Sequence, residues 1–176
     1  MDEHNGKKAL RKRLRRWRRQ QEAAWVADAS AQICAAVRAL PQWQAAQTVM
    51  LYRAMPGEVQ VEALAAGKRA CWPVVAGRGL PLLLRGDGPT QPGPYGIQEP
   101  TEQCPEIALG EVDLVIVPGL GFDDGGGRLG MGGGFYDRTL AQMRAVRIGV
   151  CFRGQRVGAV PRDAHDLLMD VVVSEL

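Results

Sequence analysis

The 176-residue sequence has no long apolar segment, and its apolar runs, such as Leu114 to Val117, are short. A helix that crosses a bilayer needs about 20 apolar residues in succession, so these runs argue against a membrane span. The basic amino terminus is not followed by the apolar core of a signal peptide. We therefore expect a cytoplasmic protein with no membrane partner.

Cysteine and histidine are also scarce. The four cysteines are far apart and form no C-x-x-C pair, which argues against a zinc site or a disulfide framework and favours reduced, packed thiols. His4 lies near the terminus and is expected to be inert. His165 sits between Asp163 and Asp166, and we expect it in a solvated loop rather than as a metal ligand or general base.

Aromatic residues make up only 6% of the chain, but the hydrophobic content of 46% is ordinary for a globular protein. A chain of 176 residues can bury most of its apolar surface in one domain and is short for two. No internal repeat and no boundary divides it. The sequence therefore predicts one domain over residues 1–176. We expect a monomer, but no feature of the sequence determines the oligomeric state.

Charge is distributed unevenly along the chain. The first twenty residues hold nine Lys or Arg and two acids, while the remainder holds thirteen bases and seventeen acids. Leu10, Leu14 and Trp17 recur at helical spacing within residues 7–19, which predicts an amphipathic helix with a basic face. Such a face can bind nucleic acid nonspecifically, but a solvated surface is the more common reason for it. We therefore do not expect nucleic acid as a partner.

Short apolar runs alternate with helical patterns in the rest of the chain. This alternation predicts an α/β fold with a largely parallel open sheet flanked by helices. Ligands of such sheets bind outside the carboxyl ends of the strands. The expected strands are 48–52, 69–75, 80–84, 114–117, 147–151 and 171–173, and the expected helices are 7–19, 25–40, 59–66 and 136–144. Residues 86–105, rich in Pro and Gly, are expected to form an ordered loop.

The most informative stretch runs from Asp113 to Leu140. A buried strand enters a glycine-dense loop that leads into a helix near Phe135, and nine of the chain's 22 glycines fall between Gly119 and Gly134. Loop amides and the positive end of a helix dipole both favour an anion, so this arrangement predicts a phosphate site. The glycine spacing matches neither a Walker loop nor the usual Rossmann loop.

Two charged residues refine the phosphate hypothesis. Arg128 lies inside the loop, where a guanidinium can donate two hydrogen bonds to phosphate oxygens. Asp137 lies in the first turn of the predicted helix, where a carboxylate can hold Mg²⁺ beside phosphate. The alternative is a flexible surface loop in which Asp137 only complements the helix dipole.

The same stretch resembles the signature of the 5-formyltetrahydrofolate cyclo-ligase family, also called 5,10-methenyltetrahydrofolate synthetases. The matching pattern is Pro-Gly-x-x-Phe-Asp, then Arg-Leu-Gly, a glycine turn and Tyr-Asp-Arg. Further segments similar to the family cover nearly the whole chain: Lys7 to Arg11, Glu58, Gly67 to Val75, and Tyr95 to Pro100. The resemblance implies an ATP- and Mg²⁺-dependent ligase of one-carbon folate metabolism. Such an enzyme cyclises 5-formyltetrahydrofolate to 5,10-methenyltetrahydrofolate and releases ADP and phosphate.

The resemblance also implies roles for particular residues. Arg128, Glu58 and Tyr136 would be catalytic. The folate would be bound by Glu58 and by the turn residues Met131, Gly132, Gly133, Gly134 and Phe135. ATP would be bound by Lys7, Arg11, Arg128, Leu129, Gly130, Met131, Gly132, Gly133, Gly134, Phe135 and Tyr136.

Mg²⁺ would be held by Asp137 and by a second carboxylate, for which Asp166 fits the family pattern better than Asp163. The alternative for Asp166 is a cap or turn residue, and for Glu58 a solvated loop acid. The rings of Phe135 and Tyr136 could stack on pterin or adenine, or simply anchor the helix to the sheet.

Some parts of the family pattern are weaker in this chain. Residues 53–56 are not a close match, so acceptance of polyglutamylated folate is open, and Tyr95 and Glu99 are only candidates for the folate pocket. Two other functions remain as alternatives. One is a divergent protein that binds MgATP but acts on another acceptor. The other is a nucleic-acid-binding module that uses the arginine-rich helix.

Overall fold

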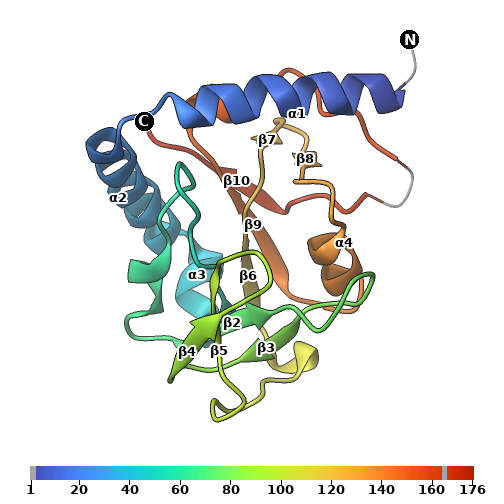
Figure 1. Cartoon of the computed structure of the whole chain (residues 1–176). Helices are drawn as coiled ribbons and strands as arrows, with labels where there is room; N and C mark the ends of the chain where they lie inside the picture. Colours follow the sequence, from blue (N-terminus) through green and yellow to red (C-terminus); the bar gives the residue numbers. More distant parts are fainter. Residues whose placement is uncertain (1–2, 164–165) are drawn as a thin grey trace.

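The computed structural model describes residues 3–163 and 166–176. Its centre is a six-stranded sheet in the order β10-β9-β6-β1-β2-β3 (Figure 1). Strand β3 runs antiparallel to β2, and the other neighbouring strands are parallel. The strands are β1 (Thr48–Met50), β2 (Arg69–Val74), β3 (Leu83–Arg85), β6 (Leu114–Val117), β9 (Val146–Val150) and β10 (Val171–Val173). The predicted α/β class with a largely parallel sheet is confirmed.

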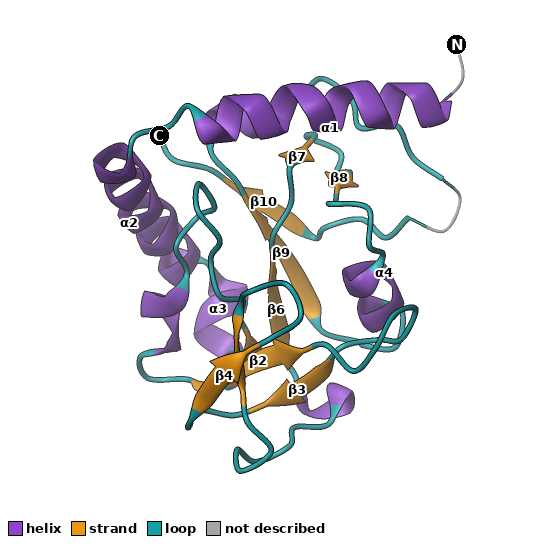
Figure 2. Ribbon diagram, in the orientation of Figure 1, coloured by secondary structure: helices purple, strands orange, loops and turns teal. Residues whose placement is uncertain are grey.

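Helices cover this sheet (Figure 2). They are α1 (Glu3–Arg19), α2 (Ala23–Ala39), α3 (Pro41–Ala45) and α4 (Phe135–Leu140), with short 3₁₀ turns at Glu62–Ala65, Leu109–Glu111 and Arg153–Gln155. Two small hairpins lie outside the sheet: β4 (Thr90–Pro92) with β5 (Gln98–Pro100), and β7 (Gly121–Phe122) with β8 (Arg128–Leu129).

Helix α1 is amphipathic, as its sequence predicts. Leu14 is 2% exposed and packs with Leu120 and Leu129 of the β7–β8 region and with Val160. In Figure 1, α1 runs directly above β7 and β8. Packing of this apolar face therefore holds α1 across the glycine-rich segment. The cations next to the apolar face are thereby directed toward that segment.

The sheet has a topological switch point between β1 and β6. The chain leaves β1 to build β2 on one side, and later returns to place β6 on the other side of β1. The segments that follow these two parallel strands diverge at their carboxyl ends and leave a place for ligands between them. The segment after β1 carries Glu58, and the segment after β6 carries the glycine-rich stretch.

Several predicted boundaries were wrong for local reasons. The segment expected as a helix over residues 59–66 has only one 3₁₀ turn. Val59 accepts a hydrogen bond from the Tyr52 hydroxyl, and the Gln60 amide donates to Ser30 Oγ, so tertiary contacts bind the backbone that a helix would use. Helix α4 ends at Leu140 rather than at residue 144, because the amides of Gln142 and Met143 bond three residues back instead of four.

Candidate functional site

Glu58 lies buried beside α1 rather than in a solvated loop, with 9% of its surface exposed. Its Oε1 accepts a hydrogen bond of 3.0 Å from Arg18 Nη1, and its Oε2 accepts one of 3.0 Å from the Met55 amide. Burial raises the pKa of Glu58, although the Met55 amide and the Arg18 charge act against the rise. Gly57 has φ +76°, and a β-carbon there would lie 2.9 Å from the Arg18 carbonyl oxygen, so only glycine lets the chain approach α1 this closely.

The glycine-rich stretch, which the sequence predicts to be one loop, is divided into two parts in the structure. Its first part forms the β7–β8 hairpin, closed by Asp123, whose Oδ1 accepts a 2.8 Å bond from the Gly127 amide. Asp123 also accepts bonds from the Val160 amide and Arg162. Burial acts to raise the pKa of Asp123, but Arg162 and the two backbone donors outweigh it and hold the pKa at about 2. These glycines thus build a structural hairpin.

The second part of the stretch, residues 130–134, is the turn before α4. Arg11 Nε donates to the Gly130 carbonyl and Arg15 Nη2 to the Met131 carbonyl, both at 3.0 Å. The amides of residues 131–133 donate to no acceptor within the described part of the chain. Gly132 and Gly134 have φ of +105° and +68°, which favours glycine at both positions. The turn therefore directs two carbonyls to α1 and leaves its amides available to an anion.

Arg128 and Asp137 form an ion pair beside this turn. Arg128 Nη2 lies 2.8 Å from Asp137 Oδ1, and Arg128 Nη1 donates to the Pro118 carbonyl after β6. The Arg128 side chain is 6% exposed, whereas that of Asp137 is 37% exposed. The Arg128 guanidinium also lies 5.6 Å from the Tyr136 ring centroid. These contacts hold the Arg128 side chain in place beside the turn.

Tyr136 and Phe135 both pack against the core cluster on one face of the sheet. Burial raises the pKa of the Tyr136 hydroxyl well above its usual range, and the Glu58 charge adds to the rise. The charge of Glu58, in the segment after β1, thus acts on the Tyr136 hydroxyl at the start of α4. Phe135 also meets the exposed Tyr95 ring edge-on, with 5.8 Å between centroids. Both rings thus anchor α4, and Phe135 additionally reaches the loop that follows β4.

Lys7 joins α1 to the carboxyl-terminal segment. Its Nζ lies 2.5 Å from Asp163 Oδ2 and 2.8 Å from Asp166 Oδ2. Burial alone would lower the pKa of Lys7, but the hydrogen bonds and charges of both aspartates raise it. Lys7 and Arg11 are four residues apart and share one helix face, so this face of α1 contacts both Asp166 and the glycine turn. Both candidate carboxylates therefore contact Lys7, and the choice between them stays a prediction.

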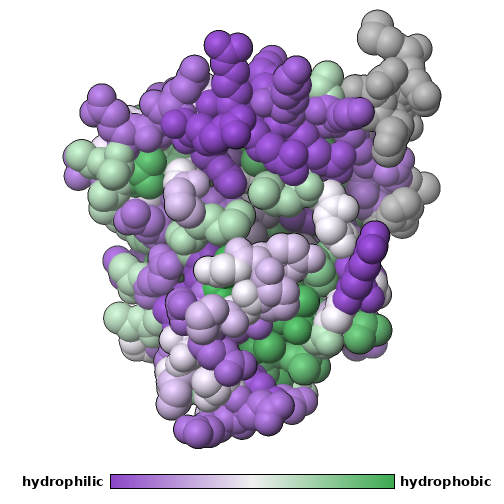
Figure 3. All heavy atoms as spheres, viewed as in Figure 1, coloured by the Kyte–Doolittle hydropathy of each residue, from purple (hydrophilic) through white to green (hydrophobic). Residues whose placement is uncertain are grey.

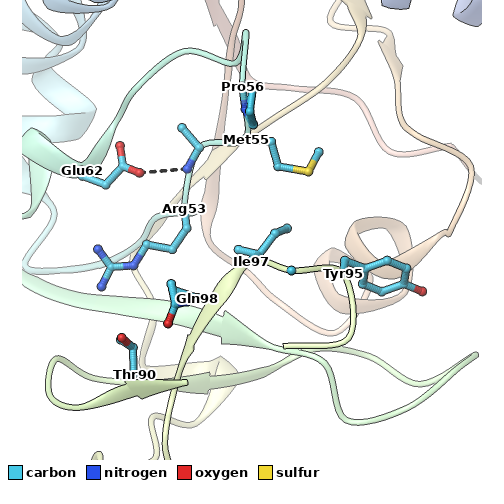
Figure 4. A pocket seen from close by; sticks show the side chains of 10 residues that line it. Arg53, Met55, Pro56, Glu62, Thr90, Tyr95, Ile97 and Gln98 are labelled. Atoms are coloured by element: carbon cyan, nitrogen blue, oxygen red, sulfur yellow. Dashed lines mark hydrogen bonds between the residues drawn. The ribbon is translucent and has the colours of Figure 1, made fainter. Parts of the chain in front are cut away.

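A cavity of about 550 Å³ is lined by residues that contact Glu58 and Phe135 (Figure 4). Met55, whose amide binds Glu58, lines it, as do the expected Tyr95 and its neighbours Gly96 to Gln98. Glu99 lies elsewhere: it is buried and accepts a bond of 3.2 Å from the Val75 amide, and burial raises its pKa. The sequence did not single out Arg53, Glu62, Thr90 and Gln98, which also line the cavity. The sequence feature that could have indicated Arg53 is its position directly after the predicted strand 48–52, where ligands of parallel sheets bind.

The residues present fit a magnesium ion that is shared with phosphate. Within the described residues no three acidic, histidine or cysteine side chains gather as a complete cage. Mg²⁺ usually takes only one or two carboxylates and completes its shell with phosphates and water. Asp137, partly exposed with its Oδ1 bound to Arg128, and Asp166 are carboxylates of this kind. His165 lies outside the described residues, as does the amino terminus before residue 3.

The state of the cysteines and the length of the helices relate to two predictions from composition. All four cysteines are free and buried, so no disulfide links them. Among the helices that the structure describes, none is long and apolar enough to cross a membrane.

Comparison with known proteins places this arrangement in one family. The sequence profile of the 5-formyltetrahydrofolate cyclo-ligase family matches residues 3–175. A 5-formyltetrahydrofolate cyclo-ligase of Haemophilus influenzae is 32% identical over 145 residues, which cover 73% of this chain and 76% of that protein. The corresponding Escherichia coli enzyme is also 32% identical, over 142 residues, with 73% and 78% covered.

Solved structures of 5,10-methenyltetrahydrofolate synthetases have the same fold as this chain. The NMR structure of Aquifex aeolicus 5,10-methenyltetrahydrofolate synthetase superposes with a TM-score of 0.85 at 31% identity and covers 95% of this chain and 88% of that one. A Mycoplasma pneumoniae 5,10-methenyltetrahydrofolate synthetase, at 22% identity, shares the fold with a TM-score of 0.76, covering 96% and 98%. From the extent of the profile match and these relatives, the chain belongs to the 5-formyltetrahydrofolate cyclo-ligase family.

Proposed function

We propose that this ligase cyclises 5-formyltetrahydrofolate to 5,10-methenyltetrahydrofolate at the switch point between β1 and β6, using MgATP. The observation that carries the proposal is the convergence of three features there: the free amides of residues 131–133, the Arg128–Asp137 pair, and buried Glu58. One side of the site offers cations and amides for a polyphosphate. The other offers a carboxyl group and a cavity for the folate.

The chemical difficulty lies in the formyl group, which is an amide whose oxygen leaves poorly. In the proposed reaction this oxygen attacks the γ-phosphorus of ATP, so that the bond to ADP breaks and a carbon–oxygen–phosphorus link forms. N10 then attacks the formyl carbon and loses its proton, and phosphate leaves with the oxygen. The result is a ring in which the carbon bridges N5 and N10. The protein must mainly align these groups and balance their charge.

Cationic side chains and amides would perform this alignment. Arg128 is held by Pro118 and Asp137, so its position is fixed before phosphate arrives. Lys7 and Arg11 would approach the same phosphates from α1. Asp137 and Asp166 would hold Mg²⁺, which when bound with ATP neutralises phosphate charge. The Arg128–Asp137 and Lys7–Asp166 contacts keep these opposite charges balanced within the protein.

Glu58 would bind the pterin near the formyl group. Because burial raises its pKa, its carboxyl group can accept or donate a hydrogen bond more readily than an exposed glutamate at the same pH. Tyr136, whose hydroxyl stays protonated, would supply a neutral donor close by. Neither role requires a nucleophilic side chain.

A spectrophotometric assay tests the proposal. Purified protein with 5-formyltetrahydrofolate, ATP and Mg²⁺ should produce the near-ultraviolet absorbance of the methenyl product together with ADP. Omission of ATP should abolish the signal, and EDTA should reduce it strongly. Binding of MgATP without turnover of this folate would instead support the divergent protein with another acceptor. Failure of both binding and turnover would refute the phosphate site itself.

A further inference from the structure

Arg53 lies three residues after the end of β1 and makes no hydrogen bond or ion pair with any residue that the structure describes, although it is partly buried and its Nε is fully covered. A buried donor without an acceptor is costly, and a charged one more so. Arg53 lines the 550 Å³ cavity next to Glu58. A cation held without a partner in a cavity indicates that the cavity takes an anion.

The guanidinium of Arg53 is held in place by stacking. It lies 3.6 Å from the centroid of the Trp72 ring, face-on to a buried side chain of β2. The Trp72 Nε1 in turn donates a 2.7 Å bond to Asp87 Oδ1, which fixes the ring. Arginine stacks well on indole and then presents its planar edge to an acceptor. Arg53 is therefore preorganised, and little side-chain freedom remains to be lost on binding.

The cavity holds one other charged group, Glu62. Its Oε1 accepts a 2.8 Å bond from the Ala54 amide, which directs this carboxylate to the backbone (Figure 4). Glu62 therefore has an acceptor role of its own and forms no ion pair with Arg53. The remaining lining side chains, among them Thr90, Tyr95 and Gln98, are uncharged. Arg53 is the cation available to an incoming anion among the residues that line this cavity.

The cavity adjoins the reacting end of the proposed site at two points. Met55 lines it, and the Met55 amide binds Glu58. Tyr95 lines it too and meets Phe135 at the start of α4. In Figure 4, Tyr95 and Arg53 lie on opposite sides of the view, with Met55 and Ile97 between them. A ligand whose pterin reached Glu58 could thus extend through the cavity toward Arg53.

We propose that Arg53 binds a carboxylate of the glutamate tail of the folate and so determines which tails the enzyme accepts. The inference rests on the proposed function. The formyl-pterin end of the substrate carries no negative charge, whereas each glutamate supplies a carboxylate whose two oxygens match a guanidinium edge. Arg53 acts on substrate binding and takes no part in phosphoryl transfer. Substitution of Arg53 should therefore change the KM for the folate rather than kcat.

Kinetics with two folates test this assignment. One is 5-formyltetrahydrofolate, and the other is its diamide, in which both glutamate carboxyls are carboxamides. Wild-type protein should show a KM for the diamide about 10- to 100-fold higher, as expected for loss of a charge-assisted hydrogen bond. Arg53→Gln should raise the KM for the acid by a similar factor and leave the KM for the diamide nearly unchanged. Arg53→Lys, which keeps the charge, should restore part of the preference.

Arg78→Gln serves as the matched control, because Arg78 is an exposed arginine outside the cavity and its loss changes the net charge equally. It should leave both KM values unchanged. If Arg53→Gln raised both KM values equally, or lowered only thermal stability, Arg53 would be a structural partner of Trp72 and the inference would fail. Wild-type protein that turns over neither folate would instead refute the proposed function, so the two failures are distinguishable.

Discussion

At the scale of the residue, this site is arranged around ion pairs that already exist without ligand. Arg128 and Asp137 are paired at 2.8 Å, and Lys7 contacts both Asp163 and Asp166. Arg128 and Lys7, two of the cations proposed for phosphate, thus lie beside carboxylates proposed for the metal. A nucleotide with its magnesium would bring phosphate oxygens to the two cations and the metal ion to the carboxylates. The pairs therefore hold the site in position without leaving a strong unbalanced charge in a partly buried region.

The metal assignment predicts the behaviour of Asp137→Asn. The amide keeps the size of the side chain and can still accept from Arg128, but it removes the negative charge that a magnesium ligand needs. We expect kcat to fall on the order of a hundredfold or more, as for loss of charge stabilisation in a transition state, with little change in the melting temperature. The measurement is the absorbance assay over a range of Mg²⁺ concentrations.

Asp124→Asn is the matched control for that variant. Asp124 lies in the same glycine-rich stretch, its side chain is 93% exposed, and it forms an ion pair with Arg156. It should retain full activity. An Asp137→Asn protein as active as wild type would show that the metal is held elsewhere.

Asp123 has a structural role, and its lowered pKa predicts how the free energy of unfolding depends on pH. The folded value of about 2 lies below the ordinary value of 3.8, so ionised Asp123 stabilises the fold. This contribution, about 2 kcal/mol, is present above pH 3.8 and is lost as the pH falls toward about 2. Asp123→Asn should lower the free energy of unfolding by about this amount at pH 7 in urea titrations. The difference from wild type should shrink near pH 3, and a pH-independent difference would contradict the assignment.

At the scale of the element, α1 has two faces with different surroundings. Lys7, Arg11 and Arg18 face the body and contact Asp166, Gly130 and Glu58. Lys12, Arg13, Arg16 and Arg19 face solvent, where Figure 3 shows a continuous hydrophilic surface over the helix. The apolar stripe that buries Leu14 decides which cations belong to which face.

This division predicts different effects for two substitutions on the same helix. Lys7→Gln should raise the KM for ATP about tenfold, because a charge-assisted contact to phosphate is lost. Arg13→Gln should leave the KM within error, because an exposed cation contributes little. Both are measured by the same ATP titration. Equal effects of the two substitutions would mean that α1 acts through its overall charge, as in the nucleic-acid-binding alternative.

At the scale of the whole molecule, the proposed nucleotide site joins segments from both ends of the chain. Helix α1, the glycine turn and the carboxyl-terminal segment with Asp166 meet there, and the Lys7 and Arg11 contacts already link them. A ligand that binds across such a junction stabilises all three segments against unfolding. If the chain forms one domain, as the sequence predicts, it should unfold in a single cooperative transition.

Thermal unfolding can test both expectations. MgATP at about 100 times its dissociation constant should add about 2.7 kcal/mol to the free energy of unfolding and raise the melting temperature. ATP with EDTA should add clearly less, because the phosphates would then meet the two aspartates without the ion. Scanning calorimetry in the presence and absence of Mg²⁺ gives the comparison. Two separate transitions would contradict the single domain, and equal shifts with EDTA would contradict the metal.

The sequence alone determined the class of fold and the family. Residues 114–117 are apolar throughout, because a strand in the middle of a parallel sheet is buried on both faces, and the structure places β6 there. The face of α1 followed from the spacing of Leu10, Leu14 and Trp17. These features depend on neighbours in the sequence, and so local pattern was sufficient to predict them.

Only the tertiary structure decided the use of the individual side chains. The first glycines of the dense stretch close a hairpin because Asp123 meets Val160 and Arg162, which lie far along the chain. Glu58 is buried because α1 brings Arg18 to it, and Arg53 is free because Trp72 stacks beneath it without offering an acceptor. Each outcome depends on partners at long sequence separation, whose distances no local pattern fixes. The physical reason is that burial and pairing, rather than residue type, set the charge that a side chain can carry.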